Sequence, residues 1–332
     1  MKAKEKRKPK TILAGIDIGS SRVRVLLEDE GLVFDEPCVL AVDRKGQCLA
    51  IGEQAWQMRG LSDDEVRVIR PLENNVVNFP ALDTFLEQLC LDTGIFRMFK
   101  KTVIALSYPT MLSSQDVQVL KEHLIHLGAE KVYFDQEILF SALGSRIDLY
   151  APVASGIMNI GHENCEIAVY AKGQLIEKSG FSMNGQAVSR QITGWFHDQK
   201  RLLVSEETVE SIKENLGGFI PVRRPKAMEI RGISLDTHNL ESAVIDENQI
   251  AQVLEPILEQ WAIWITAFLE ALDPSDRQDI IMRGIVACGG CLKLRGLASS
   301  LSNLCGLPIY CTDEPSLTVI QGLSSLLQKA EL

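Results

Sequence analysis

The sequence predicts an α/β fold of two related lobes, each carrying a small subdomain. Three observations support this prediction. A glycine-tipped β-hairpin near the start of the chain recurs in its middle. Strand patterns and amphipathic helix patterns alternate along the chain, as they do in α/β folds. The length of 332 residues is sufficient for two domains that each bury a core.

The two hairpins have the same spacing. In each, an apolar strand ends in a polar residue, turns at a glycine and returns as a second strand. The interval from the polar residue to the next turn glycine is the same, from Asp17 to Gly31 and from Asn159 to Gly173. Glycine and small polar residues at such a tip can present backbone N–H groups to an anion. The two tips predict a phosphate chain clamped between related domains, and the alternative is a pair of unrelated hairpins.

The composition limits the function. A formal net charge of −10 disfavours nucleic acid as a partner, because a phosphate backbone requires a basic footprint. The exception is residues 1–10, where six basic residues accompany one acid, and this pattern predicts a disordered tail. No apolar stretch has the length of a transmembrane helix or the pattern of a signal peptide.

The cysteine pattern predicts reduced thiols. Eight cysteines are scattered without the density of a disulfide scaffold, which indicates a cytoplasmic protein. Cys288 and Cys291 have CxxC spacing, so a redox or metal role is an alternative. No second CxxC pair exists to complete a zinc site, and two glycines between the cysteines predict a tight turn.

In the first half of the chain, apolar runs bounded by turn residues predict strands at 12–18, 32–42, 49–52, 66–71, 101–108 and 131–134. Apolar residues at helical spacing predict a helix over 81–91. Further helices are predicted over 53–59, over 114–127 after a serine pair, and over 136–144 with Glu137 at its N-terminal end.

The second half continues the alternation. Short strands are predicted at 223–225, 228–233, 243–245, 284–287 and 308–311. Helices are predicted over 186–196, 205–216, 248–272, 294–304 and 316–329. Ser205, which acidic residues follow, predicts a helix cap.

A hydrophobic connection follows the helix over 81–91. Residues 94–101 contain four large apolar side chains interleaved with Arg97, Lys100 and Lys101; the four are Ile95, Phe96, Met98 and Phe99. The pattern is typical of a membrane-dipping loop, in which apolar tips enter the acyl boundary and cations meet anionic head groups. The alternative is burial of the apolar residues under the preceding helix.

Seven ordered segments make the chain resemble the MreB/Mbl branch of the bacterial actins, within the superfamily of actin, sugar kinases and heat-shock chaperone ATPases. The resemblance runs from about Ile12 to the end of the chain. The segments are GIDIGSS at 15–21, DEP at 35–37, IGEQA at 51–55, IRPLEN at 69–74, MEIRG at 228–232, RGIV at 283–286 and LRGL at 294–297.

The resemblance implies an actin-like fold with ATP and Mg²⁺ in a cleft between two lobes. It implies a lobe I large subdomain formed by residues 11–32 and 76–146 with a C-terminal helix over 314–332, and a small subdomain over 33–75. It implies a lobe II large subdomain formed by residues 147–180 and 247–313, and a small subdomain over 181–246.

The resemblance also assigns roles to individual residues. Asp17 falls on the first-loop aspartate, which organises water around Mg²⁺, and Glu137 falls on the catalytic carboxylate that orients the attacking water. Other matches fall on phosphate loops, the adenosine pocket and a glycine turn: Gly19, Ser20, Ser21, Asn159, Gly161, Lys213, Glu214, Gly289 and Gly290.

The second phosphate loop departs from the family pattern of an aspartate, three glycines and two threonines. The residues here are Asn159, Gly161, His162, Glu163, Asn164 and Cys165. Asn159 removes a negative charge from the Mg²⁺ shell, and Glu163 adds a carboxylate next to a polyanion. Gln186 stands where the family has an aspartate, and Cys291 replaces a glycine. Together these changes predict weak or absent hydrolysis.

We therefore expect a cytoplasmic, actin-like filament protein, peripheral at the inner face of the membrane, in cell-shape maintenance or wall-synthesis positioning. Its expected partners are itself or MreB-type paralogues, and not nucleic acid. Any chemistry is slow ATP hydrolysis. The alternatives are a pseudo-ATPase that co-assembles with an active relative and, more weakly supported, a small-molecule kinase of the superfamily.

Overall fold

The computed structural model describes residues 11–59, 65–74, 76–109 and 112–329. The basic tail predicted over residues 1–10 lies outside the described residues. The chain divides into two compact units. Unit 1 runs to Gly144 and takes up the chain again from Val319, and unit 2 is Ser145–Thr318.

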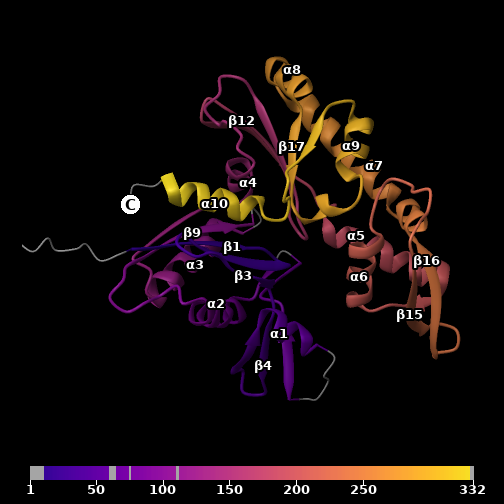
Figure 1. Cartoon of the computed structure of the whole chain (residues 1–332), viewed down its shortest axis with the longest axis horizontal. Coiled ribbons are helices and arrows are strands. Elements are labelled where there is room, and N and C mark those ends of the chain that lie inside the picture. Colours follow the sequence, from indigo (N-terminus) through magenta and orange to yellow (C-terminus); the bar gives the residue numbers. More distant parts are fainter. Residues whose placement is uncertain (1–10, 60–64, 75, 110–111, 330–332) are drawn as a thin grey trace, which may run out of the picture. The chain divides into compact units, whose positions relative to one another are not determined.

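Unit 1 is built on a five-stranded sheet in the order β10-β9-β1-β2-β3 (Figure 1). Strand β1 runs parallel to β9, and β9 runs parallel to β10, whereas β2 and β3 are antiparallel. The strands are β1 (Ile12–Ile18), β2 (Arg22–Leu27), β3 (Gly31–Pro37), β9 (Thr102–Tyr108) and β10 (Lys131–Gln136).

Helices α2 (Phe79–Thr93) and α3 (Ser114–Leu127) bury their apolar residues in one cluster with this sheet. Asn78 caps the start of α2, and Gly94 ends it in the left-handed conformation. Ser113 caps α3 in a capping box with Asp116.

Helix α4 (Glu137–Gly144) follows β10 directly, and the last helix of unit 1 is α10 (Thr318–Lys329). Gly15 lets α10 approach β1 closely, because a Cβ there would lie 3.2 Å from Leu323. Gly322 does the same against α4, where a Cβ would clash with the Phe140 carbonyl.

A smaller sheet, β5-β4-β6, belongs to unit 1 with its own apolar cluster. It consists of β4 (Leu40–Asp43), β5 (Cys48–Ile51) and β6 (Val66–Ile69), with helix α1 (Gly52–Gln57). A two-stranded ladder of β7 (Leu72–Glu73) and β8 (Val76–Val77) follows.

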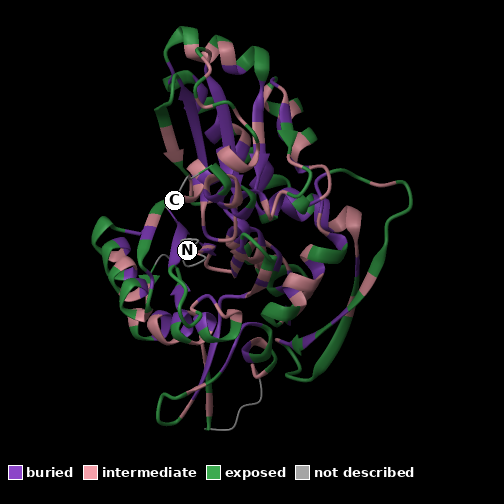
Figure 2. Cartoon of the chain, turned by 60° about the vertical axis from the view of Figure 1, so that its left-hand side comes forward, coloured by how far each residue is buried: buried purple, intermediate pink, exposed green. Residues whose placement is uncertain are grey.

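Unit 2 repeats the topology of the unit 1 sheet. Its five strands have the order β13-β12-β11-β17-β18, and β11 is antiparallel to β12 and parallel to β17. They are β11 (Ser155–Ile160), β12 (Cys165–Ala171), β13 (Gln174–Gly180), β17 (Ile285–Cys288) and β18 (Ile309–Cys311). Figure 2 shows the central strands of each unit as largely buried.

The helices of unit 2 supply much of its core. Trp261 of α7 and Phe196 of the π-helical turn η1 are completely buried. The helices are α5 (Gly185–Trp195), η1 (Phe196–Lys200), α6 (Glu206–Leu216), α7 (Glu247–Ala271), α8 (Pro274–Arg283), the 3₁₀ turn η2 (Gly290–Lys293) and α9 (Leu297–Cys305).

Some details of unit 2 differ from the sequence prediction. The strand predicted at 223–225 is wrong, because these residues are irregular and β15 starts only at Ala227. Helix α8 was not predicted, because it is short and polar and buries only Ile280 completely. The small sheet is β14-β15-β16, formed by Leu202–Leu203, Ala227–Ser234 and Leu240–Asp246.

Candidate functional site

In unit 1, the predicted site residues gather at one edge of the sheet. The parallel strands β1, β9 and β10 all end at this edge. Asp17 lies opposite Ser107 in the β1–β9 ladder, and Glu137 begins α4 directly after β10. The carboxyl ends of parallel strands are where α/β sheets place their ligands. The sheet therefore brings together two residues that are distant in the sequence.

The pKa of Asp17 reports the proximity of Glu137. Asp17 is only 3% exposed, and its pKa is raised from 3.8 to about 7. Burial is the main cause, and repulsion from the Glu137 carboxylate is the second. Arg24 and the Ser107 hydroxyl act in the opposite direction. The Asp17 and Glu137 carboxylates are therefore close enough to influence each other.

Arg24 is a site residue that the sequence analysis missed. It lies directly opposite Asp17 in the β1–β2 ladder, and its Nη1 donates to Asp17 Oδ2 at 3.4 Å. Its Nε is 3.2 Å from Asp35 Oδ1, which also accepts from Arg22 Nε at 2.8 Å. The Arg24 side chain is only 12% exposed. The sequence did contain a signal for it, because a basic residue occupies an alternate position of the strand that must pair with the Asp17 strand.

This arrangement does not fit a magnesium ion. Mg²⁺ is bound through oxygen ligands and their waters, and Asp17 already has a guanidinium as its counter-ion. Two unit charges of like sign 4 Å apart repel by about 4 kcal/mol near a protein surface. An Mg²⁺ ion at this distance from the Arg24 guanidinium would be repelled roughly twice as strongly, because it carries two charges. Among the described residues, no group of three or more His, Cys, Asp and Glu side chains could hold a metal ion.

The tip of the unit 1 hairpin is a tight glycine turn. Gly19 N–H donates to Arg22 O at 3.1 Å, and a Cβ on Gly19 would lie 2.9 Å from the same oxygen. Only glycine fits this position without a shift of the backbone. Ser20 and Ser21 follow in the turn and are partly exposed.

The unit 2 hairpin reproduces this turn. Gly161 N–H donates to Asn164 O at 2.7 Å, with the same interval of three residues. Asn159 takes the ladder position of Asp17 and is 1% exposed. Neither atom of its amide has a hydrogen-bond partner among the described residues. Gly289, at the end of β17, has a φ of +97° and no room for a Cβ against the Asn159 amide.

The tip of the unit 2 hairpin, which the sequence predicts to be the second phosphate loop, is docked onto the start of α5. Gly185 N–H donates to Gly161 O at 2.9 Å, and Gln186 N–H donates to His162 O at 2.7 Å. Asn184, the cap of α5, donates from Nδ2 to Glu163 O at 2.8 Å. The first N–H groups of a helix are its ready-made anion site. In α5 the loop's own carbonyls already accept from Gly185 and Gln186.

Lys213 is held inside a polar cluster between α5 and α6. Its Nζ lies 2.9 Å from Ser189 Oγ, 3.3 Å from Gly185 O, and 2.9 and 3.0 Å from the two carboxylate oxygens of Glu210. Burial raises the pKa of Glu210, but Lys213, Ser189 and His162 together lower this pKa by more than burial raises it, so the net shift is downward. The ammonium is therefore engaged within unit 2, whereas Glu214 is exposed.

Both cysteines of the CxxC pair are buried, reduced thiols. Cys291 Sγ donates to Gly161 O at 3.4 Å, so this thiol also holds the second loop. Burial raises the pKa of Cys291 to about 11. Gly290, between the two cysteines, is exposed and has open space around it.

The hydrophobic loop of unit 1 is only partly available to a membrane. Including Ile95 in the apolar tip was wrong, because Ile95 is completely buried in the core. Phe96 is partly buried, and its ring lies against Gly128. Met98 and Phe99 are 82% and 89% exposed, and Phe99 has a positive φ of 63°.

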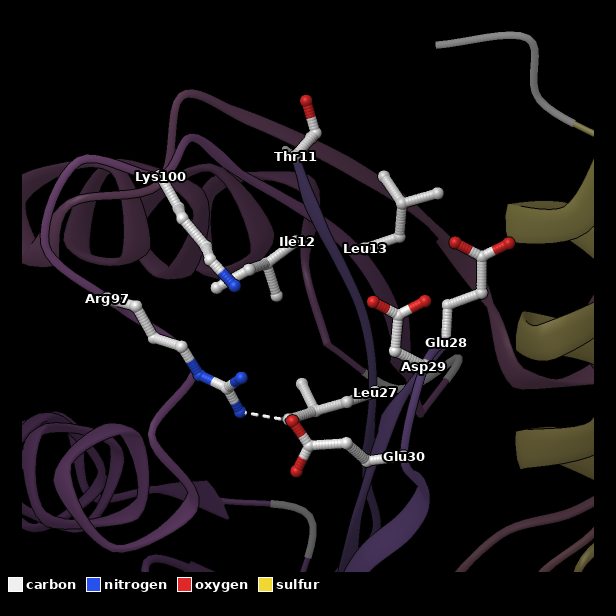
Figure 3. A pocket seen from close by; sticks show the side chains of 9 residues that line it. All are labelled: Thr11, Ile12, Leu13, Leu27, Glu28, Asp29, Glu30, Arg97 and Lys100. Atoms are coloured by element: carbon white, nitrogen blue, oxygen red, sulfur yellow. Dashed lines mark hydrogen bonds and ion pairs between the residues drawn. The ribbon is translucent and has the colours of Figure 1, made fainter. Parts of the chain in front are cut away.

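Two of the three cations expected to meet lipid are paired with acids. Arg97 forms an ion pair with Glu30, and Lys101 forms one with Glu130. Arg97 and Lys100 line a small hollow beside the start of β1, together with acidic residues of the β2–β3 turn (Figure 3). This hollow lies at the opposite end of β1 from Asp17, so it is not part of the carboxylate site.

The comparisons with known proteins agree with this architecture. The model of the MreB/Mbl protein family matches residues 11–332. Cell shape-determining protein Mbl of Bacillus cereus is 28% identical over 322 residues, which are 96% of each chain. MreB 5 of Spiroplasma citri, bound to AMPPNP, has a TM-score of 0.88 at 22% identity and 95% coverage of both chains.

A further solved structure, the MamK double helical filament, has a TM-score of 0.80 at 15% identity and covers 97% of this chain and 100% of its own. These likenesses confirm the actin-like fold class that the sequence predicted. Within the described residues, no helix is long and apolar enough to cross a membrane.

Proposed function

Because the chain belongs to the MreB/Mbl family, we propose that it is a cytoskeletal filament protein that assembles at the inner membrane surface. Its role there is cell-shape maintenance or the positioning of wall synthesis, with weak or lost ATP hydrolysis. The relatives it matches are cell shape-determining proteins, and it spans nearly their whole length. The protein is cytoplasmic and peripheral to the membrane in this proposal.

The docked second loop is the observation that supports weak hydrolysis. Its carbonyls accept from the first N–H groups of α5, and Cys291 donates to the same loop. A phosphate would have to displace these bonds before it could use the helix N-terminus. Asn159 also supplies no charge where the family has an aspartate.

A steady-state ATPase assay tests this part of the proposal. The wild-type rate is expected to lie well below that of an intact MreB under the same conditions, and an equal rate would overturn the proposal. The four changes Asn159→Asp, His162→Gly, Glu163→Gly and Cys165→Thr should raise nucleotide affinity. The matched control carries Asn215→Asp and Cys305→Thr, which lie outside the loop.

Nucleotide binding itself is supported by the relatives. MreB 5 of Spiroplasma citri has been crystallised with AMPPNP and with ADP. In this proposal, Asp17 and Glu137 belong to the unit 1 part of such a site, and the turn at Gly289 and Gly290 belongs to the unit 2 part. Glu137 is the residue that would orient an attacking water.

Self-assembly is supported by the MamK filament, which shares the fold. Longitudinal subunit contacts in this proposal come from the lobe surfaces, so filaments should form even where the second loop binds nucleotide poorly. Negative-stain electron microscopy with and without ATP, on anionic lipid, tests this directly. A protein that stays monomeric by sedimentation under all of these conditions is not a self-assembling scaffold.

Membrane attachment is proposed for the exposed tip formed by Met98 and Phe99. Fully burying one such side chain is worth about 1.5–3 kcal/mol, so one tip binds lipid weakly. A filament presents many tips at once, and binding becomes tight through avidity. Phe99 holds an unfavourable left-handed conformation in full exposure, which is typical of residues kept for a function.

The alternative is a nucleotide-deficient pseudo-ATPase that co-assembles with an active relative. The Arg24–Asp17 ion pair and the uncharged Asn159 favour it, because both weaken metal-assisted phosphate chemistry. Co-sedimentation with a purified MreB paralogue separates the two functions. Filaments of the chain alone support the first function, and filaments only with the paralogue support the second.

A further inference from the structure

We propose that Arg24 supplies, from within the chain, the positive charge that a divalent cation would bring to Asp17, so that the Asp17–Glu137 pair takes no Mg²⁺. The inference rests on the proposed nucleotide site and specifies its metal requirement. Any nucleotide held at this edge of unit 1 is then bound without a metal ion at Asp17.

The ladder places the guanidinium beside the carboxylate. Directly opposite residues of an antiparallel pair carry their side chains on the same face of the sheet. Asp17 and Arg24 are such a pair, and the ion pair joins them at 3.4 Å. Both side chains are largely buried, so solvent screens their interaction only weakly.

The rest of the network keeps Arg24 in this position. Asp35 lies opposite Arg24 in the β2–β3 ladder and approaches its Nε at 3.2 Å. Arg22 binds the same Asp35 oxygen and therefore limits its movement. A guanidinium does not lose its proton in proteins. The positive charge next to Asp17 is therefore permanent and fixed in place.

The charge of the neighbouring groups explains why this cation is needed. Asp17 lies near the end of β1 and Glu137 begins α4, and their carboxylates repel each other. A buried carboxylate next to a second one requires a counter-charge or a proton. Above its pKa of about 7, Asp17 is ionised, and Arg24 then provides the counter-charge without any ion from solution. Removing Arg24 should therefore create a cation site where none exists in the wild type.

Titration with Mn²⁺ alone, at a pH above 7 where Asp17 is ionised and followed by the loss of the free Mn²⁺ EPR signal, tests the inference without nucleotide or filaments. The wild type should show no saturable site that depends on Asp17. The Arg24→Gln variant should bind Mn²⁺ at least about tenfold more tightly, which corresponds to about 1.4 kcal/mol. Adding Asp17→Asn to Arg24→Gln should abolish that gain.

Arg22→Gln is the matched control. It removes an equal charge from the same Asp35 network but does not touch Asp17, so it should leave Mn²⁺ binding at the wild-type level. Arg24→Lys keeps the charge and should also create no site. A gain in Arg22→Gln equal to that in Arg24→Gln would show a general charge effect and overturn the inference.

The wild type provides a decisive measurement even if Arg24→Gln does not fold. A saturable Mn²⁺ site in the wild type that disappears in Asp17→Asn would overturn the inference. The metal titration is independent of assembly, so a failure to form filaments would count only against the proposed function. An ATP affinity that is unchanged by EDTA would extend the inference to the nucleotide, and a strong loss in EDTA would contradict it.

Discussion

Asp17 and Asn159 hold the same place in two hairpins of the same geometry. Each is the last polar residue before a glycine turn, and each pairs with the residue seven positions later, Arg24 or Glu166. The two turns close with the same backbone hydrogen bond, from Gly19 and from Gly161. The two units therefore share the backbone geometry of this hairpin but not the charges of its side chains. A carboxylate paired with an arginine in unit 1 corresponds to a neutral amide paired with a glutamate in unit 2.

The buried amide of Asn159 predicts an unusual stability effect. Replacing Asn159 by Leu, which has the same branched shape, should leave the free energy of unfolding within about 1 kcal/mol or increase it, because an amide without partners is removed. Asn159→Asp should instead lower it by several kcal/mol at neutral pH, since a carboxylate is then buried near Glu166. Urea unfolding measures both, and exposed Asn215→Asp is the control. Equal losses for Leu and Asp would contradict the prediction.

The raised pKa of Asp17 predicts a pH dependence. The folded state holds a proton on Asp17 between pH 3.8 and about 7, whereas the unfolded state has lost it. The folded state binds more protons in this window, so the contribution to stability falls as the pH rises through it. Asp17→Asn should flatten the stability profile between pH 4 and 7. Asp135→Asn, an exposed neighbour, should leave the profile unchanged.

The Lys213 cluster should contribute substantially to the packing of α5 on α6. Lys213→Met leaves the Glu210 carboxylate without its ammonium, and breaking a buried pair in this way costs about 3–5 kcal/mol. Partial exposure of Glu210 places the expected loss at the lower end. The double variant with Glu210→Gln should recover part of it in urea unfolding. No recovery would mean that the charge pair does not carry the effect.

The pH profile of the same pair has the opposite sign to that of Asp17. The folded pKa of Glu210 is lowered, so its contribution is present above the unfolded value and is lost as the pH falls through the folded value. Stability in acid should therefore be less pH-dependent in Glu210→Gln than in the wild type. The comparison uses the same urea series at decreasing pH.

The exposed tip formed by Met98 and Phe99 predicts that lipid binding can be removed without a loss of stability. Met98→Ser with Phe99→Ser should abolish sedimentation with anionic liposomes and leave solution assembly and stability intact. Ile95→Ser should instead lower the free energy of unfolding by roughly 3 kcal/mol, because Ile95 belongs to the core. Leu91→Ser, a 74% exposed apolar site on α2, is the control for nonspecific effects. Unchanged pelleting of the double variant would leave the tip without a lipid role.

Most of the secondary structure was accessible from the sequence, because it depends on local patterns. The alternation of apolar residues, the caps of α3 and α6, and the repeated glycine turns are all short-range features. Helix α8 was missed because its apolar face is too small to produce a helical period. The location of Ile95 could not be predicted, since an apolar residue in a short loop serves core and membrane equally well.

By itself, the sequence determined that the chain contains two hairpins with the same residue spacing and that the two differ in their charged residues. Hairpin geometry depends on the local order of residues and on the residue types in the turn, and both can be read directly from the sequence. Only the tertiary structure decided which side chains meet. Glu137 reaches Asp17 because β9 and β10 add in parallel to β1, and Arg24 faces Asp17 because the ladder register places them opposite each other. Side-chain contacts of this kind depend on strand order and register, which local sequence patterns do not specify.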